Sequence, residues 1–395
     1  MENVSSSNGL EKRPKLRFPG FDEPYVLHRI GDIYAERSER GAADMELLSV
    51  TMNGGVMQRS EIEGKDNSSE DKSNYKVVRK GDMVYNSMRM WQGANGVSSY
   101  DGIVSPAYTV LTAKVSICNE YFAALFKNYK LINEFRKNSQ GMTSDTWNLK
   151  YPQIETIKVY LPEVAEQEKV ASMLVTLDKR IAAQATLVEQ LKKYKRGLHK
   201  LVFIKNRKPS WEKSALHDIA SFCGGGTPSK DVSSYWDGEI GWISSSDIQE
   251  EWIDDISVTR RITKKAIDNS ATKLCPEGTI AIVSRVGVGK VAIIPESLCT
   301  SQDFTNITSI TGNTHYMAYQ IAFRMKLEAM KTQGTSIKGV TADTIKSMGV
   351  DIPPLEEQKK IADMLTAFDS YIKRAVYELD IFLTMKKALL QQLFI

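Results

Sequence analysis

The chain has 395 residues, of which 42% are hydrophobic and 25% are charged, and its formal net charge at pH 7 is +4. This length is enough for two or three domains, each with its own core. So small a net charge does not by itself indicate a nucleic-acid partner. A basic run without any acidic residue extends from Lys192 to Lys208, but a solvated helix end followed by a linker gives the same pattern.

The cysteines and the N-terminus bear on location. The four cysteines, Cys118, Cys223, Cys275 and Cys299, are far apart in the sequence, which excludes a CxxC zinc or redox site and favours a reducing compartment. No run of about 18 apolar residues is present, and residues 1–15 lack the apolar core of a signal peptide. We therefore expect a cytoplasmic protein whose residues 1–15 form a disordered tail.

The first globular segment is predicted to span residues 16–160. Strand-like runs outnumber helical ones and do not alternate regularly with helices, which favours an α+β fold over a parallel α/β fold. The expected strands are 46–52, 75–78, 82–87 and 103–111, and the expected helix is 119–138.

A long stretch over residues 161–204 then occurs a second time over residues 352–395, with an offset of 191. Each copy opens with proline and acidic residues, which suit a first helical turn. Apolar residues recur at alternating steps of four and three, the seam pattern of a coiled coil. The seam positions are Val170, Leu174, Leu177, Ile181, Val188, Leu191 and Leu198 in the first copy, and Ile361, Leu365, Phe368, Ile372, Leu379, Phe382 and Leu389 in the second.

Two helices with one seam pattern favour packing against each other, although each helix could instead pack on its own globular domain. If an approximate two-fold axis relates the two halves of the chain, the helices must run antiparallel. Lys195 and Lys386 interrupt the seam at the same place in both copies. About 40 helical residues make a rod of roughly 60 Å, which predicts a spacer.

A basic linker over residues 205–210 leads into a second globular segment, residues 211–351. Its expected strands are 239–244, 279–284 and 290–294, and its expected helix is 315–330. Three weak sequence matches relate it to the first segment: residues 27–30 resemble 216–219, residues 80–84 resemble 277–281, and residues 140–141 resemble 333–334. A shared frame with divergent loops is expected when two copies of a domain recognise different targets.

The sequence offers no persuasive active site or metal site. It lacks the Asn-Pro-Pro-Tyr/Phe and Asp-Pro-Pro-Tyr motifs of amino-methyltransferases, and it has no G-x-G-x-x-G after a strand. Gly287-Val-Gly-Lys290 resembles only the tail of a phosphate-binding loop, and the four histidines are scattered without an HExxH motif. We therefore expect a non-catalytic chain that binds no metal or cofactor of its own.

Side chains suited to DNA recognition are easier to find. Arg, Asn and Gln can pair bidentately with base edges, whereas hydroxyls, lysines and glycine backbone amides can contact phosphates. Any one of these polar stretches could equally be an ordinary turn. On this chemistry alone the predicted DNA-binding residues are Asn86, Ser87, Arg89, Trp91, Gln92, Gly225, Gly226, Thr227, Ser229, Lys230, Ser245, Arg285 and Lys290.

These features together resemble the specificity (S) subunits of type I restriction–modification systems. The resemblance covers the chain after its N-terminal tail and rests on short motifs at matching places. They are Pro14-Lys-Leu-Arg-Phe-Pro-Gly-Phe21, Lys80-Gly-Asp82, Ser105-Pro-Ala-Tyr108, Gly225-Gly-Thr-Pro-Ser-Lys230, Trp236, Gly241-Trp-Ile243 and Pro353-Pro-Leu-Glu-Glu-Gln358.

The resemblance implies two target recognition domains related by a pseudo-two-fold axis, each followed by a long helix, with the helices paired as an antiparallel coiled coil. Each domain would read one half of a split, asymmetric target in double-stranded DNA. Two modification (M) subunits would dock and methylate adenine with S-adenosylmethionine, and restriction (R) subunits would cleave with ATP and Mg. Two alternatives stay open: a specificity subunit of a modification-only system, or a coiled-coil scaffold that binds proteins rather than DNA.

Overall fold

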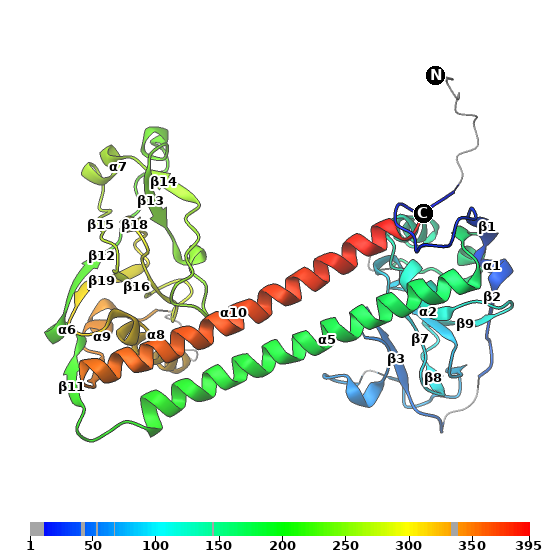
Figure 1. The fold of residues 1–395 in the computed structure, drawn as a ribbon, viewed down its shortest axis with the longest axis horizontal. Coiled ribbons are helices and arrows are strands. Elements are labelled where there is room, and N and C mark those ends of the chain that lie inside the picture. The colour runs from blue at the N-terminus through cyan, green and yellow to red at the C-terminus, as the bar shows by residue number, and fades with distance from the viewer. Residues whose placement is uncertain (1–11, 41–43, 53, 67, 144–145, 333–338) are drawn as a thin grey trace. The chain divides into compact units, whose positions relative to one another are not determined.

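The computed structural model describes residues 12–40, 44–52, 54–66, 68–143, 146–332 and 339–395. The chain divides into two compact units: unit 1 comprises Met1–Ala185 and Tyr377–Ile395, and unit 2 comprises Thr186–Val376. Each unit contains one globular domain and a part of each long helix (Figure 1). Within the described residues, no helix is both long and apolar enough to cross a membrane.

The domain of unit 1 is built on a four-stranded antiparallel sheet in the order β2-β9-β6-β7, accompanied by three two-stranded ladders. The sheet comprises β2 (Tyr34–Glu36), β9 (Tyr108–Ala113), β6 (Met83–Asn86) and β7 (Asn95–Val97). The ladders pair β1 (Val26–Arg29) with β10 (Lys158–Leu161), β3 (Leu48–Thr51) with β4 (Gly55–Gln58), and β5 (Lys76–Val78) with β8 (Gly102–Val104). The helices are α1 (Ile30–Ile33), η1 (Arg59–Glu61), η2 (Met90–Gln92), α2 (Asn119–Leu125), α3 (Tyr129–Asn138) and α4 (Tyr151–Ile154).

The predicted helix over 119–138 is interrupted at Asn128, so that α2 and α3 are separate helices. Asn128 is buried, and its side-chain oxygen caps α3 by accepting a hydrogen bond from the backbone N–H of Lys130 at 2.9 Å. Its amide nitrogen donates to the carbonyl oxygen of Leu390 on the last long helix at 2.7 Å. Helical periodicity missed this break, since Asn128 is fixed by a partner far away in the sequence.

The domain of unit 2 repeats the four-stranded sheet in the order β12-β19-β16-β17 and adds a second sheet in the order β14-β13-β18-β15. The first comprises β12 (Ala220–Gly224), β19 (Phe304–Ile310), β16 (Ile280–Val283) and β17 (Val291–Ile293). The second comprises β14 (Arg260–Ile262), β13 (Ile240–Ile243), β18 (Leu298–Thr300) and β15 (Leu274–Cys275), while β11 (Glu212–Ala215) pairs with β20 (Gly349–Ile352). The helices are α6 (Leu216–Ile219), η4 (Ser233–Tyr235), η5 (Ser245–Asp247), α7 (Lys264–Asp268), α8 (Thr314–Thr332) and α9 (Ala342–Lys346).

The two domains share a strand frame, as the weak sequence matches predicted. Gly81 before β6 and Gly278 before β16 have φ angles of +93° and +80°, a conformation that favours glycine, and both strands are third in their sheets. The sequence match that aligned residues 27–30 with 216–219 was wrong in its alignment by three residues. The structural counterpart of α6 is α1, which begins at Ile30 because residues 26–29 form β1. Residues 333–334 of the third match lie outside the described residues.

The repeated stretches form the long helices α5 (Val164–Lys200) and α10 (Leu355–Gln392), and α5 runs into a π-helical turn (Leu201–Lys205). Each helix begins three residues after the start of the repeat, because Leu161 and Ile352 still belong to strands β10 and β20. Gln167 and Gln358 make equivalent hydrogen bonds at the starts of the two helices. Gln167 accepts from the backbone N–H of Cys118 and donates to the carbonyl of Pro162. Gln358 accepts from the backbone N–H of Asn313 and donates to the carbonyl of Pro353.

The two long helices pair antiparallel, because residue numbers rise along α5 as they fall along α10. In unit 1 Asp178 forms an ion pair with Lys386, and in unit 2 Lys195 forms one with Asp369 at 2.7 Å. All the predicted seam residues are buried or half-buried. The α+β fold with two domains, each followed by a long helix, is confirmed. Neither helix packs only on its own domain.

Candidate nucleic-acid interfaces

In domain 1 the predicted recognition residues lie where β6 passes into the single turn η2. Asn86 ends β6, and its side-chain oxygen accepts a hydrogen bond from the backbone N–H of Met88 at 3.0 Å, which turns the chain outward. Ser87 points inward: it is buried, and its hydroxyl lies 2.8 Å from that of Thr109. Ser87 therefore supports the turn and does not face a ligand.

The other side chains of this turn form a cationic and aromatic surface together with Arg136 of α3 and Trp147, with the two arginines exposed and the other three side chains half-buried. We call it the η2 surface (Arg89, Trp91, Gln92, Arg136 and Trp147). Arg89 is exposed, and its side chain makes no hydrogen bond or ion pair within the part of the chain that the structure describes. The rings of Trp91 and Trp147 meet edge to face at a centroid distance of 5.3 Å, and the guanidinium of Arg136 lies 5.5 Å from the Trp91 centroid. Aromatic and guanidinium groups beside an exposed arginine can contact both bases and phosphates.

In domain 2 the glycine-rich segment after β12 is closely packed. A Cβ at Gly225 would lie 1.9 Å from the carbonyl oxygen of Ser301, and one at Gly226 would lie 2.4 Å from the backbone of Ala271. The backbone N–H of Gly226 donates to Thr300 at 2.8 Å, and its carbonyl accepts from the Trp242 indole at 2.9 Å. These glycines let the segment pass between two backbones. The amide of Gly226 is already used within the domain.

Several other predicted residues of domain 2 also have internal partners. Lys290 donates to the carbonyl oxygen of Ser245 at 2.9 Å, Ser245 is buried, and the Thr227 hydroxyl donates to Gln302. Ser229 and Lys230 are exposed at the end of the glycine-rich segment. Of the predicted residues in this domain, Lys230 and Arg285 are the exposed cations.

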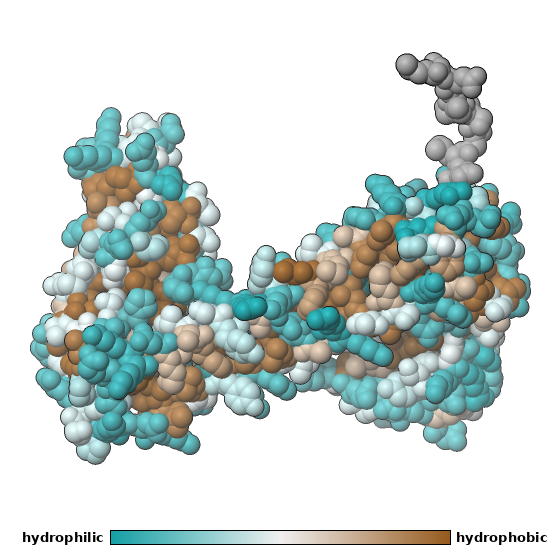
Figure 2. Space-filling view, viewed as in Figure 1, coloured by the Kyte–Doolittle hydropathy of each residue, from teal (hydrophilic) through white to brown (hydrophobic). Residues whose placement is uncertain are grey.

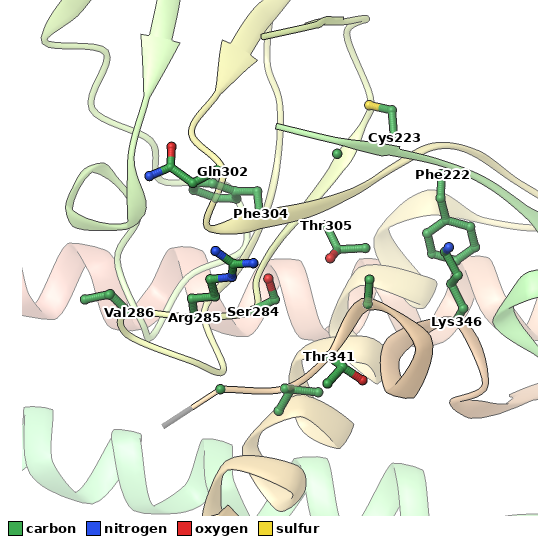
Figure 3. A pocket seen from close by; sticks show the side chains of 14 residues that line it. Phe222, Cys223, Ser284, Arg285, Val286, Gln302, Phe304, Thr305, Thr341 and Lys346 are labelled. Atoms are coloured by element: carbon green, nitrogen blue, oxygen red, sulfur yellow. The ribbon is translucent and has the colours of Figure 1, made fainter. Parts of the chain in front are cut away.

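Arg285 lies at a cleft of about 700 Å³ whose wall is formed by the ends of β12 and β19, the turn after β16, and α9. In Figure 3, Arg285 and Gln302 occupy one side of the cleft, and Phe222 and Lys346 the other. Among the described residues, the lining contains Arg285, Lys346 and hydroxyl groups but no carboxylate. Such a cleft suits an anionic, partly planar ligand, and the groups on a DNA strand meet this description.

Sequence reasoning missed Gln302 and Lys346 in domain 2 and Arg136 and Trp147 in domain 1. All four come from segments distant in sequence from the predicted motifs, so no local pattern marks them. Among the described residues, no group of three or more His, Cys, Asp or Glu side chains could hold a metal ion.

The model of the family described as "Type I restriction modification DNA specificity domain" matches this chain twice, over residues 37–193 and 209–378. The chain belongs to this family. It contains two DNA specificity domains, as the sequence motifs predicted.

Curated relatives support the same assignment. The MjaIX specificity subunit of Methanocaldococcus jannaschii is 34% identical over 167 residues, which cover 41% of this chain and 39% of that subunit. The EcoR124I/EcoR124II specificity subunit of Escherichia coli is 29% identical over 271 residues, covering 65% of this chain and 66% of that one. The alignments thus span less than two thirds of these two relatives.

Solved structures share the fold. The S subunit of the type I restriction–modification system of M. genitalium superposes with a TM-score of 0.61 at 12% identity, covering 97% of this chain and 99% of that one. A chain from a structure of type I restriction–modification complex assembly and conformational transition gives 0.59 at 15% identity, covering 96% and 99%.

Proposed function

We propose that this chain reads a split, asymmetric target in double-stranded DNA, with one half-site recognised by each domain. The observation that carries the proposal is that one strand frame displays two different sets of groups. Domain 1 presents the η2 surface, and domain 2 presents the cleft with Arg285, Gln302 and Lys346. Because the frames agree and the displayed groups differ, the two domains recognise different sequences.

Within each half-site, Arg89 and Arg285 are proposed to read bases. An arginine fork can pair bidentately with the O6 and N7 atoms of guanine, and each good bidentate pair contributes about 1–3 kcal/mol of discrimination. Gln302 is suited to adenine in the same way. Lys230 and Lys346, as flexible point charges, are assigned to phosphates, where they add affinity without sequence information.

The paired helices are proposed to be the spacer and the docking surface for modification subunits. On α10, Tyr377, Ile381 and Met385 lie four residues apart and are 66%, 39% and 46% exposed. Figure 2 shows hydrophobic side chains reaching the surface over the C-terminal part of this helix. An exposed apolar stripe on a helix is typical of a protein–protein interface.

In the proposed complex the chemistry belongs to the partner chains. Two modification subunits would methylate adenine with S-adenosylmethionine, and restriction subunits would act with ATP and Mg. A system without a restriction subunit is the second candidate, and a protein-binding scaffold is the third. The cytoplasmic location expected from the cysteines stays a prediction.

The deciding experiment is methylome sequencing of a host that carries this gene with its adjacent modification gene, with and without this chain. We expect a split motif of methylated adenines that depends on the chain. If an expressed and soluble modification partner gives no such motif, the scaffold alternative is favoured. Adding the neighbouring restriction gene, where one exists, and testing cleavage separates the complete system from a modification-only one.

The arginine assignments are tested by Arg89→Ala and Arg285→Ala, with Arg196→Ala on the exposed face of α5 as the matched control. Arg89→Ala and Arg285→Ala are each expected to lose specific binding by about 5- to 150-fold, which corresponds to about 1–3 kcal/mol, while non-specific binding falls less and the control keeps both. Arg89→Ala should relax one half of the motif and Arg285→Ala the other. Equal loss of specific and non-specific binding would assign these arginines to phosphate contact instead.

Docking is tested by Tyr377→Asp together with Ile381→Asp, with Lys387→Asp on another face of α10 as the control. We expect the double variant to fold and to lose co-purification with the modification subunit, whereas the control retains it. Retained assembly in the double variant would place the docking surface elsewhere.

A further inference from the structure

Domain 2 contains a pair of neighbouring thiols that no sequence pattern connects. Cys223 lies on β12 and Cys275 on β15, in two different sheets, and their sulfur atoms are 3.6 Å apart. Both thiols are free, Cys275 is fully buried and Cys223 is half-buried. Fifty-odd residues separate them in sequence, so only the packing of one sheet on the other brings them together.

The environment makes the two sulfurs chemically unlike. The hydrogen bond from the Cys275 thiol lowers the pKa of Cys223 to about 6, whereas the same contact and burial raise the pKa of Cys275. The contact therefore favours the thiolate form at Cys223 and the protonated form at Cys275. A thiolate is the reactive form of cysteine toward oxidants and disulfides.

Cys223 can also be reached from outside. Its residue belongs to the lining of the same cleft as Arg285 and Lys346, and Figure 3 shows its thiol on the side of β12 opposite Phe222. Cys275 lies behind it in the core with Ala281 and Leu298. Because Cys223 is half-buried and Cys275 is fully buried, a small oxidant meets Cys223 first and Cys275 second, the order required for an attacking and a resolving cysteine.

We propose that Cys223 and Cys275 form a reversible oxidation site that converts to a disulfide in the presence of a peroxide. The Cys223 thiolate attacks one peroxide oxygen, the O–O bond breaks, and water leaves with a proton from the medium, which gives a sulfenic acid. The Cys275 sulfur then attacks the Cys223 sulfur and the S–O bond breaks, and the hydroxyl group takes up the Cys275 proton and leaves as a second water. Two thiols lose two electrons and two protons, and one hydrogen peroxide becomes two waters. A dithiol reverses the reaction by exchange.

The bond would act on the segment that borders the cleft. An S–S bond is about 2.05 Å long, so the two sulfurs must approach by roughly 1.5 Å and pull β12 toward β15. Gly225 and Gly226, which follow β12, have no free space around them, so this shift is passed to the cleft. Resting on the proposed function, we infer that oxidation weakens recognition of the half-site read by domain 2 and leaves the other half-site unchanged.

The bond itself is tested on the full chain by adding hydrogen peroxide, alkylating the remaining thiols and mapping peptides under non-reducing conditions. We expect two of the four thiols to disappear, one cross-link between the peptides that contain Cys223 and Cys275, and full reversal by dithiothreitol. Cys118→Ser, the control in the other domain, should behave like the wild type, and Cys223→Ser should form no cross-link. A cross-link elsewhere, sulfenic acid on Cys223 without a cross-link, or four intact thiols would overturn the site. The wild-type map decides this even if a variant fails to fold.

Its effect is tested by comparing oxidised and reduced protein, with the modification subunit, on DNA altered in one half-site at a time. Loss of discrimination in the domain 2 half alone is expected. Unchanged discrimination in protein whose cross-link has been mapped would overturn the effect on recognition while leaving the site. Failure of the reduced protein to discriminate either half would instead count against the proposed function.

Discussion

The ion pairs between α5 and α10 allow the two units to be compared at equivalent repeat positions. Lys195 and Asp369 in unit 2 have side chains only 13% and 3% exposed, whereas Lys386 and Asp178 in unit 1 are 24% and 49% exposed. The unit 2 pair is also covered. The ammonium of Lys195 lies 4.4 Å from the Trp252 ring centroid, and the Tyr319 hydroxyl donates to Asp369 at 3.0 Å.

Burial changes what the pair does. It lowers the pKa of Lys195 and raises that of Asp369, opposite to the effect of their mutual attraction, so desolvation is the larger influence on both groups. A buried ion pair of this kind adds little net stability but penalises any arrangement that leaves one charge alone. Residues at equivalent repeat positions thus form a more exposed ion pair in unit 1. In unit 2 the ion pair is covered by Trp252 and Tyr319 of domain 2, so it favours one packing of this domain on the helices.

The largest loss of stability is expected when a charge is placed in the seam. This change tests whether each unit is stabilised by its own part of the helix pair. Leu174 and Leu365 are 2% and 1% exposed. Leu174→Asp should destabilise unit 1, and Leu365→Asp should destabilise unit 2, each by more than about 4 kcal/mol, since an unpaired carboxylate would enter the core. Hydrogen exchange resolved by peptide measures the two units separately.

The matched controls are Ser172→Asp and Ala367→Asp, which are exposed on the same helices and should change stability little. The double variant Leu174→Asp with Leu365→Asp should also lose assembly with modification subunits. Intact assembly in that double variant would remove the helix pair from the proposed docking surface.

The next largest difference in stability between the units is expected from removing one partner of each ion pair. Asp369→Ala is expected to cost about 3 kcal/mol, because Lys195 would keep a buried charge without its counter-ion, whereas Asp178→Ala should cost less than about 1 kcal/mol. Chemical denaturation gives both values. Replacing both partners by Lys195→Met and Asp369→Leu should recover much of the loss. Equal costs for the two single variants would show that burial does not distinguish the pairs.

His199 gives unit 2 an acid sensitivity that unit 1 lacks at the equivalent place, Leu390. Burial, with Lys195 nearby, lowers the pKa of His199 to about 3. Between about pH 3 and pH 6.5, His199 therefore binds a proton in the unfolded chain but not in the folded chain. Stability that is fully present above pH 6.5 is therefore lost progressively as the pH falls, by about 2 kcal/mol at pH 5.

Substituting His199→Gln should flatten this pH dependence between pH 7 and 5, as measured by denaturation at each pH. His217→Gln, at an exposed histidine of the same unit, serves as the control and should keep the wild-type slope. An unchanged slope in His199→Gln would assign the acid sensitivity to other groups.

The smallest effects should be equal in the two domains, because they test the shared frame. Gly81→Ala and Gly278→Ala each place a Cβ on a residue with positive φ, in open space, and should each cost about 1 kcal/mol through backbone strain alone. Thermal unfolding compares the two variants. A markedly larger cost in one domain would show that the two turns are not equivalent.

Part of this architecture was predictable because the signals are local or repeated. The seam residues such as Val170 and Ile372 recur at helical spacing, and that spacing requires a buried stripe wherever the helix lies. The second copy identified the partner of the first. In the sequence, Lys195 and Lys386 only interrupt the apolar seam. The structure shows that Lys195 pairs with Asp369 and Lys386 with Asp178.

The recognition surfaces were predictable only in part. Arg89 and Arg285 are exposed as expected, but Ser87, Ser245 and Lys290 are engaged inside the domain. In a loop, no periodicity states which side chain points outward, because direction is decided by contacts with distant strands. Gln302 and Lys346 reach the cleft from segments that contain no recognition motif.

The sequence by itself determined the repeat, the two long helices and the specificity-domain family, since these follow from residue spacing and short motifs. It predicted the antiparallel pairing only on the condition that a two-fold axis relates the two halves. The tertiary structure decided which polar groups of each domain face outward, which ion pair is buried and which cysteines meet. These depend on the packing of one sheet or helix on another, and residues such as Cys223 and Cys275 become neighbours only through that packing.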